Sequence, residues 1–176
     1  MTARVSGLML ATVTGESADN LGRIKVTYDD RPNNPPSNWV FIVRPMASAG
    51  FGMWYHPEVG DKVVIGFING NLDSPYMLGA IYTGSLDPPV TDTAQRVIQS
   101  KAGHKIILDD TEGSEAVTIE DSNGNSLVMD AKGIAMKSKG KITIEGAEVV
   151  VKGNQTVDIE AAGQLTGKGQ PIHLNP

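Results

Sequence analysis

Residues 127–175 read LVMDAKGIAMKSKGKITIEGAEVVVKGNQTVDIEAAGQLTGKGQPIHLN, a stretch in which short aliphatic segments return every seven or eight residues. The segments begin at Ile134, Ile142, Val149, Val157, Leu165 and Ile172, and glycines stand in most of the gaps between them. A period near seven is typical of coiled coils, but here the aliphatic residues alternate within each segment and are mostly Ile and Val, which favours β-strands. Because such strands have no partner strand of their own, they bury a narrow apolar edge by stacking on copies of themselves. The stretch therefore predicts a β-helix or solenoid.

One chain is too short to complete this architecture alone. About 70 residues, at roughly 24 residues per three-edged coil, give only about three coils with open ends and unpaired edges. Three chains wound together would pair each strand with strands of the other two. We therefore expect a homotrimer with an intertwined triple-stranded β-helix, whose core holds Ile134, Met136, Ile142, Ile144, Val149, Val151, Val157 and Ile159. The same core is predicted to extend to Ile106, Leu108, Val117, Ile119, Leu127, Met129, Leu165, Ile172 and Leu174.

The composition excludes several classes of protein. The chain has 176 residues, a net charge of -5 and no cysteine, so disulfides, thiolate chemistry and a cysteine-ligated zinc site are impossible. No apolar run of about 18 residues could span a bilayer, and the first residues lack the charged start and apolar middle of a signal peptide. We expect a protein made in the cytoplasm without a cleaved signal.

The distribution of aromatic residues divides the chain. All nine lie before residue 83, and only small and aliphatic apolar side chains follow. This predicts one core wide enough for rings and a second, thinner core. Pro88 and Pro89 stand between the two regions and cannot donate to a β-ladder. We assign 1–83 to the first domain, 84–100 to a linker and 101–176 to the β-helix with its C-terminal tip.

The first 83 residues carry the pattern of a small β-barrel. Alternating or continuous apolar runs predict five strands, at 8–14, 21–28, 39–43, 62–68 and 76–82. The first two are expected to form a hairpin, and Asn69-Gly70 is expected to form a two-residue turn with positive φ. Five short strands in about 80 residues suit an OB-fold, a five-stranded Greek-key barrel. The predicted fold class is therefore all-β, a barrel followed by a β-helix.

Several segments resemble a known family when they are taken together and in order. The matching segments are LGRIKV at 21–26, NWV at 38–40, PEVGDKVV at 57–64, NGNLDSPYMLG at 69–79, GHKIILDD at 103–110 and GNSLVMD at 124–130. They look like the landmarks of phage baseplate assembly protein V and of VgrG spike proteins. The resemblance implies a homotrimeric central spike of a contractile injection system, which is a phage tail, a type VI secretion system or a related extracellular particle.

Two features of that family are missing from this sequence. Full VgrG proteins place a large tail-hub region before the OB domain, and this chain starts about where that region would end. We therefore expect either a short member that docks on a separate hub protein or a fragment. Some phage relatives insert a lysozyme domain between barrel and helix, whereas only the linker occupies that place here, so the resemblance implies no cell-wall hydrolysis.

The residue patterns favour neither catalysis nor a bound metal. None of the three histidines, His56, His104 and His173, stands in a nucleophile or zinc-protease motif. Residues 121–125, DSNGN, faintly resemble a calcium loop, but Ser126 and Lys132 stand where the pattern needs Gly and Glu. A hairpin turn at Asn123-Gly124 explains the same residues. We expect no enzyme activity, no cofactor and no metal site.

Nucleic-acid binding is the other common function of OB-folds. Trp39, Phe51, Trp54 and Tyr55 could stack on bases, but acidic residues outnumber the basic ones in this half of the chain. A negative protein opposes the phosphate contacts that dominate such binding. We therefore expect no nucleic-acid partner and assign these aromatic residues to the core of the barrel.

The end of the chain bears on the tip of the spike. Some phage relatives bind a metal ion through a His-x-His pair near the C-terminus, but only His173 is present here. The ending resembles that of VgrG proteins, whose blunt end receives a PAAR-repeat tip protein. The resemblance thus implies a tip contact through Ile172, His173, Leu174 and Asn175.

The sequence leads to one main functional hypothesis and one alternative. The main hypothesis is a structural spike that docks on a tail hub through its OB end, carries a PAAR-repeat protein at its tip and pierces a target membrane. Such a spike would be incorporated into an injection particle or virion and delivered outside the cell or into a target cell. The alternative is a secreted β-helical protein that binds or degrades carbohydrate, which would be a monomer rather than a trimer.

Overall fold

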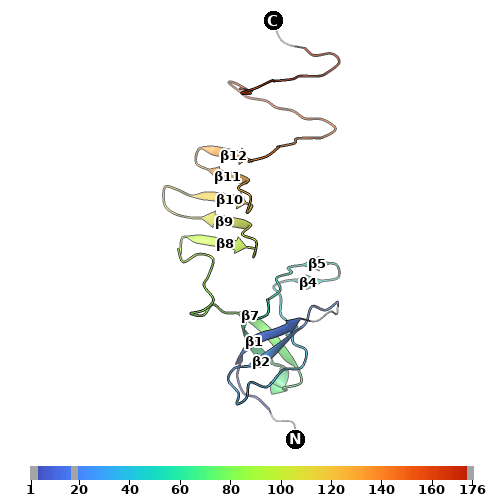
Figure 1. Ribbon diagram of the computed structural model, residues 1–176, viewed down its shortest axis with the longest axis vertical. Coiled ribbons are helices and arrows are strands. Elements are labelled where there is room, and N and C mark those ends of the chain that lie inside the picture. The colour runs from blue at the N-terminus through green and yellow to red at the C-terminus, as the bar shows by residue number, and fades with distance from the viewer. Residues whose placement is uncertain (1–3, 17–19, 174–176) are drawn as a thin grey trace. The chain divides into compact units, whose positions relative to one another are not determined.

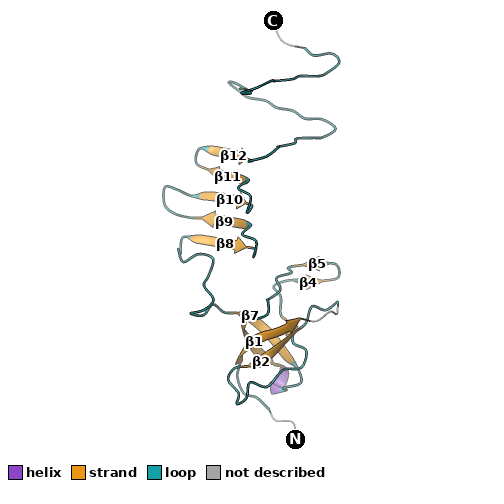
Figure 2. Cartoon of the chain, in the orientation of Figure 1, coloured by secondary structure: helices purple, strands orange, loops and turns teal. Residues whose placement is uncertain are grey.

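The computed structural model describes residues 4–16 and 20–173, and it divides into two compact units between Val97 and Ile98. Almost all of its regular structure is β-strand, as the orange arrows of Figure 2 show. The expected all-β class is therefore confirmed. The two units are described separately below.

The first unit is a five-stranded barrel. Its strands are β1 (Met9–Glu16), β2 (Ile24–Tyr28), β3 (Phe41–Ile42), β6 (Lys62–Phe67) and β7 (Pro75–Ala80), in the order β2-β1-β6-β7-β3. Figure 1 labels β1, β2 and β7 of this barrel. All neighbours are antiparallel except β3 and β7, which are parallel. Ile24 and Val40 exchange both backbone hydrogen bonds, at 3.1 and 2.9 Å, and so join β2 to the chain just before β3. The sheet thereby closes on itself as the OB-fold prediction requires.

Aliphatic side chains fill the interior of the barrel. Along β2 the residues Ile24, Val26 and Tyr28 are buried, while the residues between them are only half-buried, which is the period of two expected of a strand. Ala11, Val13, Val40, Val63, Ile65 and Met77 complete this core. Ser37 is the buried polar residue of this core region, and its hydroxyl accepts a hydrogen bond from Val26 N at 3.0 Å.

The connection between β6 and β7 agrees only in part with the prediction. Asn69 and Gly70 adopt positive φ of 52° and 72°, as the Asn-Gly pair predicts. However, the connection is longer than two residues, because a 3-10 turn, η1 (Ile68–Gly70), is followed by a turn in which Ser74 N donates to Asn71 O. A Cβ on Gly70 would lie 2.7 Å from Val5 O, so the N-terminal segment packs closely against this turn.

A separate hairpin projects from the chain between β3 and β6. It consists of β4 (Ala47–Ser48) and β5 (Phe51–Gly52), which pair only with each other (Figure 1). The sequence pattern did not predict these strands, because the segment is rich in Ala, Ser and Gly and lacks alternating apolar residues.

The second sheet is an antiparallel meander of consecutive strands. These are β8 (Gln95–Gln99), β9 (Lys105–Asp109), β10 (Ala116–Glu120), β11 (Ser126–Asp130) and β12 (Gly133–Lys137), in the order β12-β11-β10-β9-β8 (Figure 1). Strand β8 lies inside the range 84–100 that the sequence suggested as linker. Ile134 and Met136, predicted to have no partner strand in their own chain, pair with Met129 and Leu127 of β11. That expectation was wrong, because Asp130 and Gly133 form a tight turn in which Gly133 has φ of 129° and Asp130 accepts from Lys132 N.

The chain after the meander is extended but unpaired. Of the described residues from 138 to 173, none belongs to a hydrogen-bonded strand (Figure 2). The strand segments expected at Ile142, Val149, Val157, Leu165 and Ile172 therefore have no partner within one chain. Their pairing across chains stays a prediction.

Candidate assembly surfaces

One face of the meander carries two rows of aliphatic side chains. The strand register places Ile106, Ile119, Leu127 and Met136 side by side in one row, and Leu108, Val117, Met129 and Ile134 in the other. These are the eight residues of β9–β12 that the sequence assigned to a spike core. Several remain exposed to water, with exposed fractions of 45% for Leu108, 63% for Met136 and 75% for Ile134. The sheet thus brings the predicted residues onto one face and leaves that face uncovered.

A groove of about 720 Å³ follows the first row. Its apolar lining continues beyond the row to Ile98 at one end and Ile142 at the other. Polar residues outside the strands, such as His104, Asp121 and Ser138, also line it. The apolar surface therefore runs from the first strand of the meander into the extended segment that follows the last.

The opposite face of the meander is more polar. Lys105, Glu120 and Lys137 share this face, and Lys105 Nζ lies 3.2 Å from Glu120 Oε1 across the β9–β10 register. Ile107, Thr118, Val128 and Ala135 lie between the charged positions. The meander is consequently amphipathic. Antiparallel sheets with this pattern commonly pack their apolar face on a core and leave the polar face in water.

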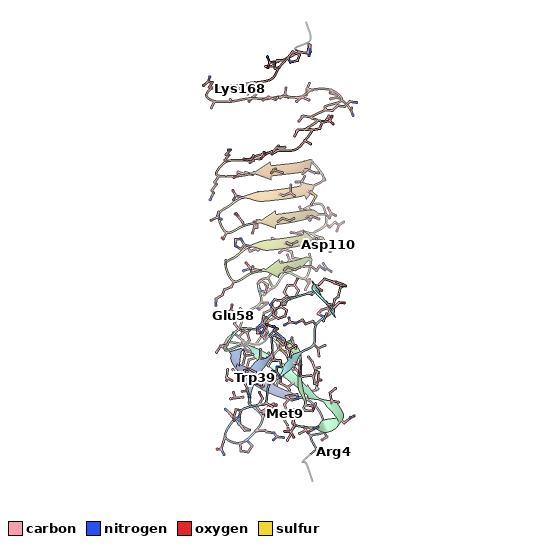
Figure 3. The ribbon with its side chains drawn as sticks, turned by 90° about the vertical axis from the view of Figure 1, so that its right-hand side faces the viewer. Arg4, Met9, Trp39, Glu58, Asp110 and Lys168 are labelled. Atoms are coloured by element: carbon pink, nitrogen blue, oxygen red, sulfur yellow. The ribbon has the colours of Figure 1, made fainter. Side chains whose placement is uncertain are left out.

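The extended segment exposes the aliphatic residues that the sequence assigned to the core. The exposed fractions are 73% for Ile144, 71% for Val151 and 69% for Ile159, and Ile142, Val149 and Val157 are also exposed. Figure 3 shows the side chains of this part standing off an extended backbone, with Lys168 labelled in its last third. Monomeric soluble proteins rarely leave so many large apolar residues in water, so this surface indicates an interface.

The predicted tip residues are only partly within the described structure. Ile172 is 54% exposed, and His173 is also exposed. Leu174 and Asn175 lie outside the described residues. The cis bond between Gln170 and Pro171 immediately precedes this end.

Asp121, in the loop between β10 and β11, is held by hydrogen bonds within that loop. Asp121 accepts hydrogen bonds from Asn125 N at 2.9 Å and from Asn125 Nδ2 at 2.7 Å, and also from Asn123 N. The bonds from Asn125, followed by those from Asn123, hold the pKa of the Asp121 carboxyl far below its ordinary value. Asn125 in turn accepts from Ser138 Oγ at 2.8 Å, which ties the start of the extended segment to this loop. The motif is thus a turn, and Gly124 with φ of 87° supplies its left-handed residue.

His56 and His104 make contacts with the backbone. His56 Nε2 lies 3.2 Å from Gly22 O and Nδ1 lies 3.0 Å from Pro57 O, while His104 Nδ1 accepts from Ser122 N at 3.3 Å. Among residues 4–16 and 20–173, no three His, Asp or Glu side chains gather as a metal site would require.

The aromatic residues correct one prediction. Trp39, Phe51, Trp54 and Tyr55 were assigned to the barrel core, but their exposed fractions are 37%, 61%, 63% and 55%. Branched aliphatic side chains already fill the interior, and Tyr28 is the ring that is buried among them. Burial raises the pKa of Tyr28 despite the nearby charge of Arg31.

The outer rings instead pair with cations. Lys25 Nζ lies 4.8 Å from the centre of the Trp39 ring, and Arg44 Cζ lies 4.1 Å from that of Trp54. Partial burial of Arg44 lowers the pKa of its guanidinium. Apolar character alone could not reveal this surface, because it does not tell an inward ring from an outward one.

No helix in the described parts of the chain has the length and apolarity needed to cross a membrane. Two family models match the chain. The OB domain of type VI secretion and phage-baseplate injectors matches residues 9–82, and the C-terminal trimerisation domain of phage baseplate protein V matches residues 95–166. The two matches coincide with the barrel and with the meander plus most of the extended segment.

Curated relatives agree with these matches. The chain is 29% identical to the type VI secretion system spike protein VgrG3 of Vibrio cholerae, over 72% of this chain and 13% of that protein. It is 26% identical to the actin cross-linking toxin VgrG1 of Vibrio cholerae, over 98% of this chain and 17% of that protein. It is also 26% identical to the spike protein VgrG1a of Pseudomonas aeruginosa, over 70% of this chain and 23% of that protein. The chain thus spans less than a quarter of the length of each of these relatives.

Proposed function

The chain belongs to the family of phage baseplate protein V and VgrG-type spike proteins, and from this premise we propose that three copies form the central spike of a contractile injection system. The two family models support this proposal, because an injector OB domain is followed directly by a trimerisation domain. The relatives named as spike proteins support the same role.

The observation that carries the proposal is the uncovered apolar face of the C-terminal unit. In a trimer the apolar rows of three meanders would face a common axis, and their polar faces would remain in water. Fully burying one large aliphatic side chain contributes about 1.5–3 kcal/mol, and every position of the repeat would contribute three times. An isolated chain has no comparable way to remove this face from water.

The extended segment would continue the same core by pairing between chains. Its alternating residues Ile142, Ile144, Val149, Val151, Val157 and Ile159 would point to the axis, after Ile134 and Met136 of β12. Each segment lacks a neighbouring strand in its own chain, and two other chains would supply the missing backbone partners. The result would be a stiff rod, and stiffness is the property that a piercing structure needs.

The remaining parts of the proposal concern partners and location. The OB end would dock on a tail-hub protein, and the end with Ile172, His173, Leu174 and Asn175 would receive a PAAR-repeat protein. The assembled particle would carry the spike outside the cell or into a target membrane. The spike would act mechanically, with no bond made or broken.

Light scattering on the purified full chain tests the central claim. We expect a mass of about 56 kDa, three times the 18.7 kDa of one chain. A mass of 18.7 kDa at all accessible concentrations would overturn the proposal and would favour the monomeric carbohydrate-active alternative. Resistance of the trimer to detergent is a second expected property, because an intertwined core leaves little surface for detergent to enter.

A further inference from the structure

The hairpin of β4 and β5, here called the arm (residues 46–53), is built differently from the barrel that carries it. Its sequence, MASAGFGM, contains small residues at every position from 47 to 52 except Phe51. The two strands of the arm lie very close together, since Met53 N donates to Met46 O at 3.0 Å and a Cβ on Gly52 would lie 2.6 Å from Met46 O. An isolated two-stranded hairpin is marginally stable in water. The arm therefore depends on contacts outside its own two strands.

The base of the arm is firmly attached to the barrel. Arg44 stacks on Trp54 and donates through Nη1 to Tyr55 O at 2.6 Å. Trp54 covers Gly22 so closely that any Cβ there would overlap the indole ring. The ring of His56 follows, 5.8 Å from that of Trp54. These contacts fix the direction in which the arm leaves the barrel.

The tip of the arm contrasts with its base. Phe51 is 61% exposed at the end of the hairpin, next to a turn in which Gly50 has φ of 80°. The phenyl ring of Phe51, exposed on a hairpin with a rigid base, resembles the aromatic anchors that fill pockets at protein interfaces.

The same unit carries a cleft of suitable chemistry. Its volume is about 370 Å³, and its apolar lining includes Ile42, Val43, Met53, Met77 and Leu78. Val43 and Leu78 are 51% and 48% exposed, so the cleft is open to an incoming apolar group. Met53 at the end of the arm lines the cleft, as do Tyr55 and His56 beside its base, but Phe51 is not among the lining residues. The ring of Phe51 therefore does not fill the cleft of its own chain.

Threefold symmetry connects the two features. A ring of three identical subunits uses head-to-tail contacts, in which two different surfaces of each subunit meet. Twelve residues separate the matched OB domain from the matched trimerisation domain. Because such a linker spans at most about 40 Å, a trimeric C-terminal unit holds three barrels at high local concentration.

From these observations we infer that Phe51 of each chain inserts into the cleft lined by Leu78 and Val43 of the next chain, and that three such contacts close a ring of OB barrels. The inference rests on the trimer proposed above, and it assigns a second trimer contact to the N-terminal unit. The occupant of the cleft is thus a second copy of this chain.

Disulfide trapping tests this contact cleanly, because the natural chain contains no cysteine. The double variant Phe51→Cys with Leu78→Cys should form bonds between chains under mild oxidation, since a disulfide requires Cα atoms about 4.4–6.8 Å apart. On a non-reducing denaturing gel we expect the band to shift from 18.7 kDa to about three times that mass. Each single variant should stay at the mass of one chain. The matched control, Phe51→Cys with Thr14→Cys, places the second cysteine on an exposed position of β1 outside the cleft and should also stay there.

The outcomes separate this inference from the proposed function. If light scattering shows a trimer but the double variant forms no disulfide between chains, the arm contact is wrong and the proposed spike function stands. Covalent dimers of Phe51→Cys alone would also overturn it, because they would place two arm tips together. A monomer by light scattering would overturn both.

Discussion

The two units of this chain use similar aliphatic residues and reach opposite degrees of burial. In the barrel, Ile24 and Ile65 have no exposed surface, whereas Ile134 and Ile144 of the C-terminal unit are 75% and 73% exposed. The barrel sheet closes on itself through the Ile24–Val40 bridge. The meander stays an open sheet, and the described residues after it, 138–173, have no partner strand. Closure within one chain lets the barrel form a core alone, while the C-terminal unit would form its core in the proposed trimer.

This contrast predicts which substitutions affect assembly and which affect only a domain. The largest effect is expected for Ile144→Asp, because the trimer would place three carboxylates together in an apolar core without partners. We expect complete loss of the trimer, measured by light scattering as a fall to 18.7 kDa.

The neighbouring residue provides the matched control. Thr143→Asp places the same charge one position away, on the opposite side of the strand expected in the trimer, and should leave the trimer intact. If Ile144→Asp stayed trimeric while Thr143→Asp dissociated, the assignment of inward residues would be shifted by one position.

A second substitution tests the autonomy of the barrel. Ile24→Ala removes a side chain with no exposed surface and should lower the free energy of unfolding of the barrel by about 2–5 kcal/mol. Both tryptophans, Trp39 and Trp54, lie in the N-terminal unit, so their fluorescence during urea unfolding reports on the barrel.

The oligomeric state completes this test. Ile24→Ala should remain trimeric under native conditions, since the C-terminal core does not contain the residue. The exposed Leu21, which is 59% exposed, gives the control Leu21→Ala with a change below about 0.5 kcal/mol. Dissociation of Ile24→Ala at the same protein concentration would show that the two units are not independent.

The sequence predicted the parts of the fold that depend on local pattern. Alternating and continuous apolar runs located the barrel strands, and Asn69-Gly70 indicated positive φ correctly, because side-chain alternation and positive φ both arise from backbone sterics. The pairing of β12 within its own chain was missed, because a repeat of seven or eight residues looks the same whether its partner strand belongs to one chain or another. The structure shows a hairpin turn after Asp130, and this turn pairs β12 with β11 of the same chain.

The outward aromatic residues were missed for a related reason. Trp54 and Phe51 are as hydrophobic as core residues, and the sequence does not say that Val and Ile already fill the barrel. The small residues around Phe51 were the available signal, since a core strand would not place Ala, Ser and Gly on both sides of its only large side chain.

The smallest expected effect concerns ion pairs in the two units. In the barrel, Lys62 Nζ donates to Asp29 Oδ2 at 2.7 Å and to Thr12 Oγ1 at 2.6 Å. Burial opposes ionisation of Asp29, but the hydrogen bonds from Lys62 and Thr12 and the charge of Lys62 prevail, so the pKa of Asp29 lies below its ordinary 3.8. Since the folded-state pKa is lowered, the carboxylate stabilises the barrel above pH 3.8 and loses this effect as pH falls through the folded-state value.

Replacement of one acidic partner in each unit compares the two pairs. Asp29→Asn should lower the free energy of unfolding by up to about 1 kcal/mol at neutral pH, and the difference from wild type should vanish well below pH 3.8. Glu120→Gln removes the acid of the Lys105–Glu120 pair, whose Nζ–Oε1 distance is 3.2 Å and whose side chains are about one third exposed, and should change the detergent resistance of the trimer little. A pH-independent loss in Asp29→Asn would instead indicate that the amide disturbs packing, because only an ionisable carboxylate produces the predicted dependence on pH.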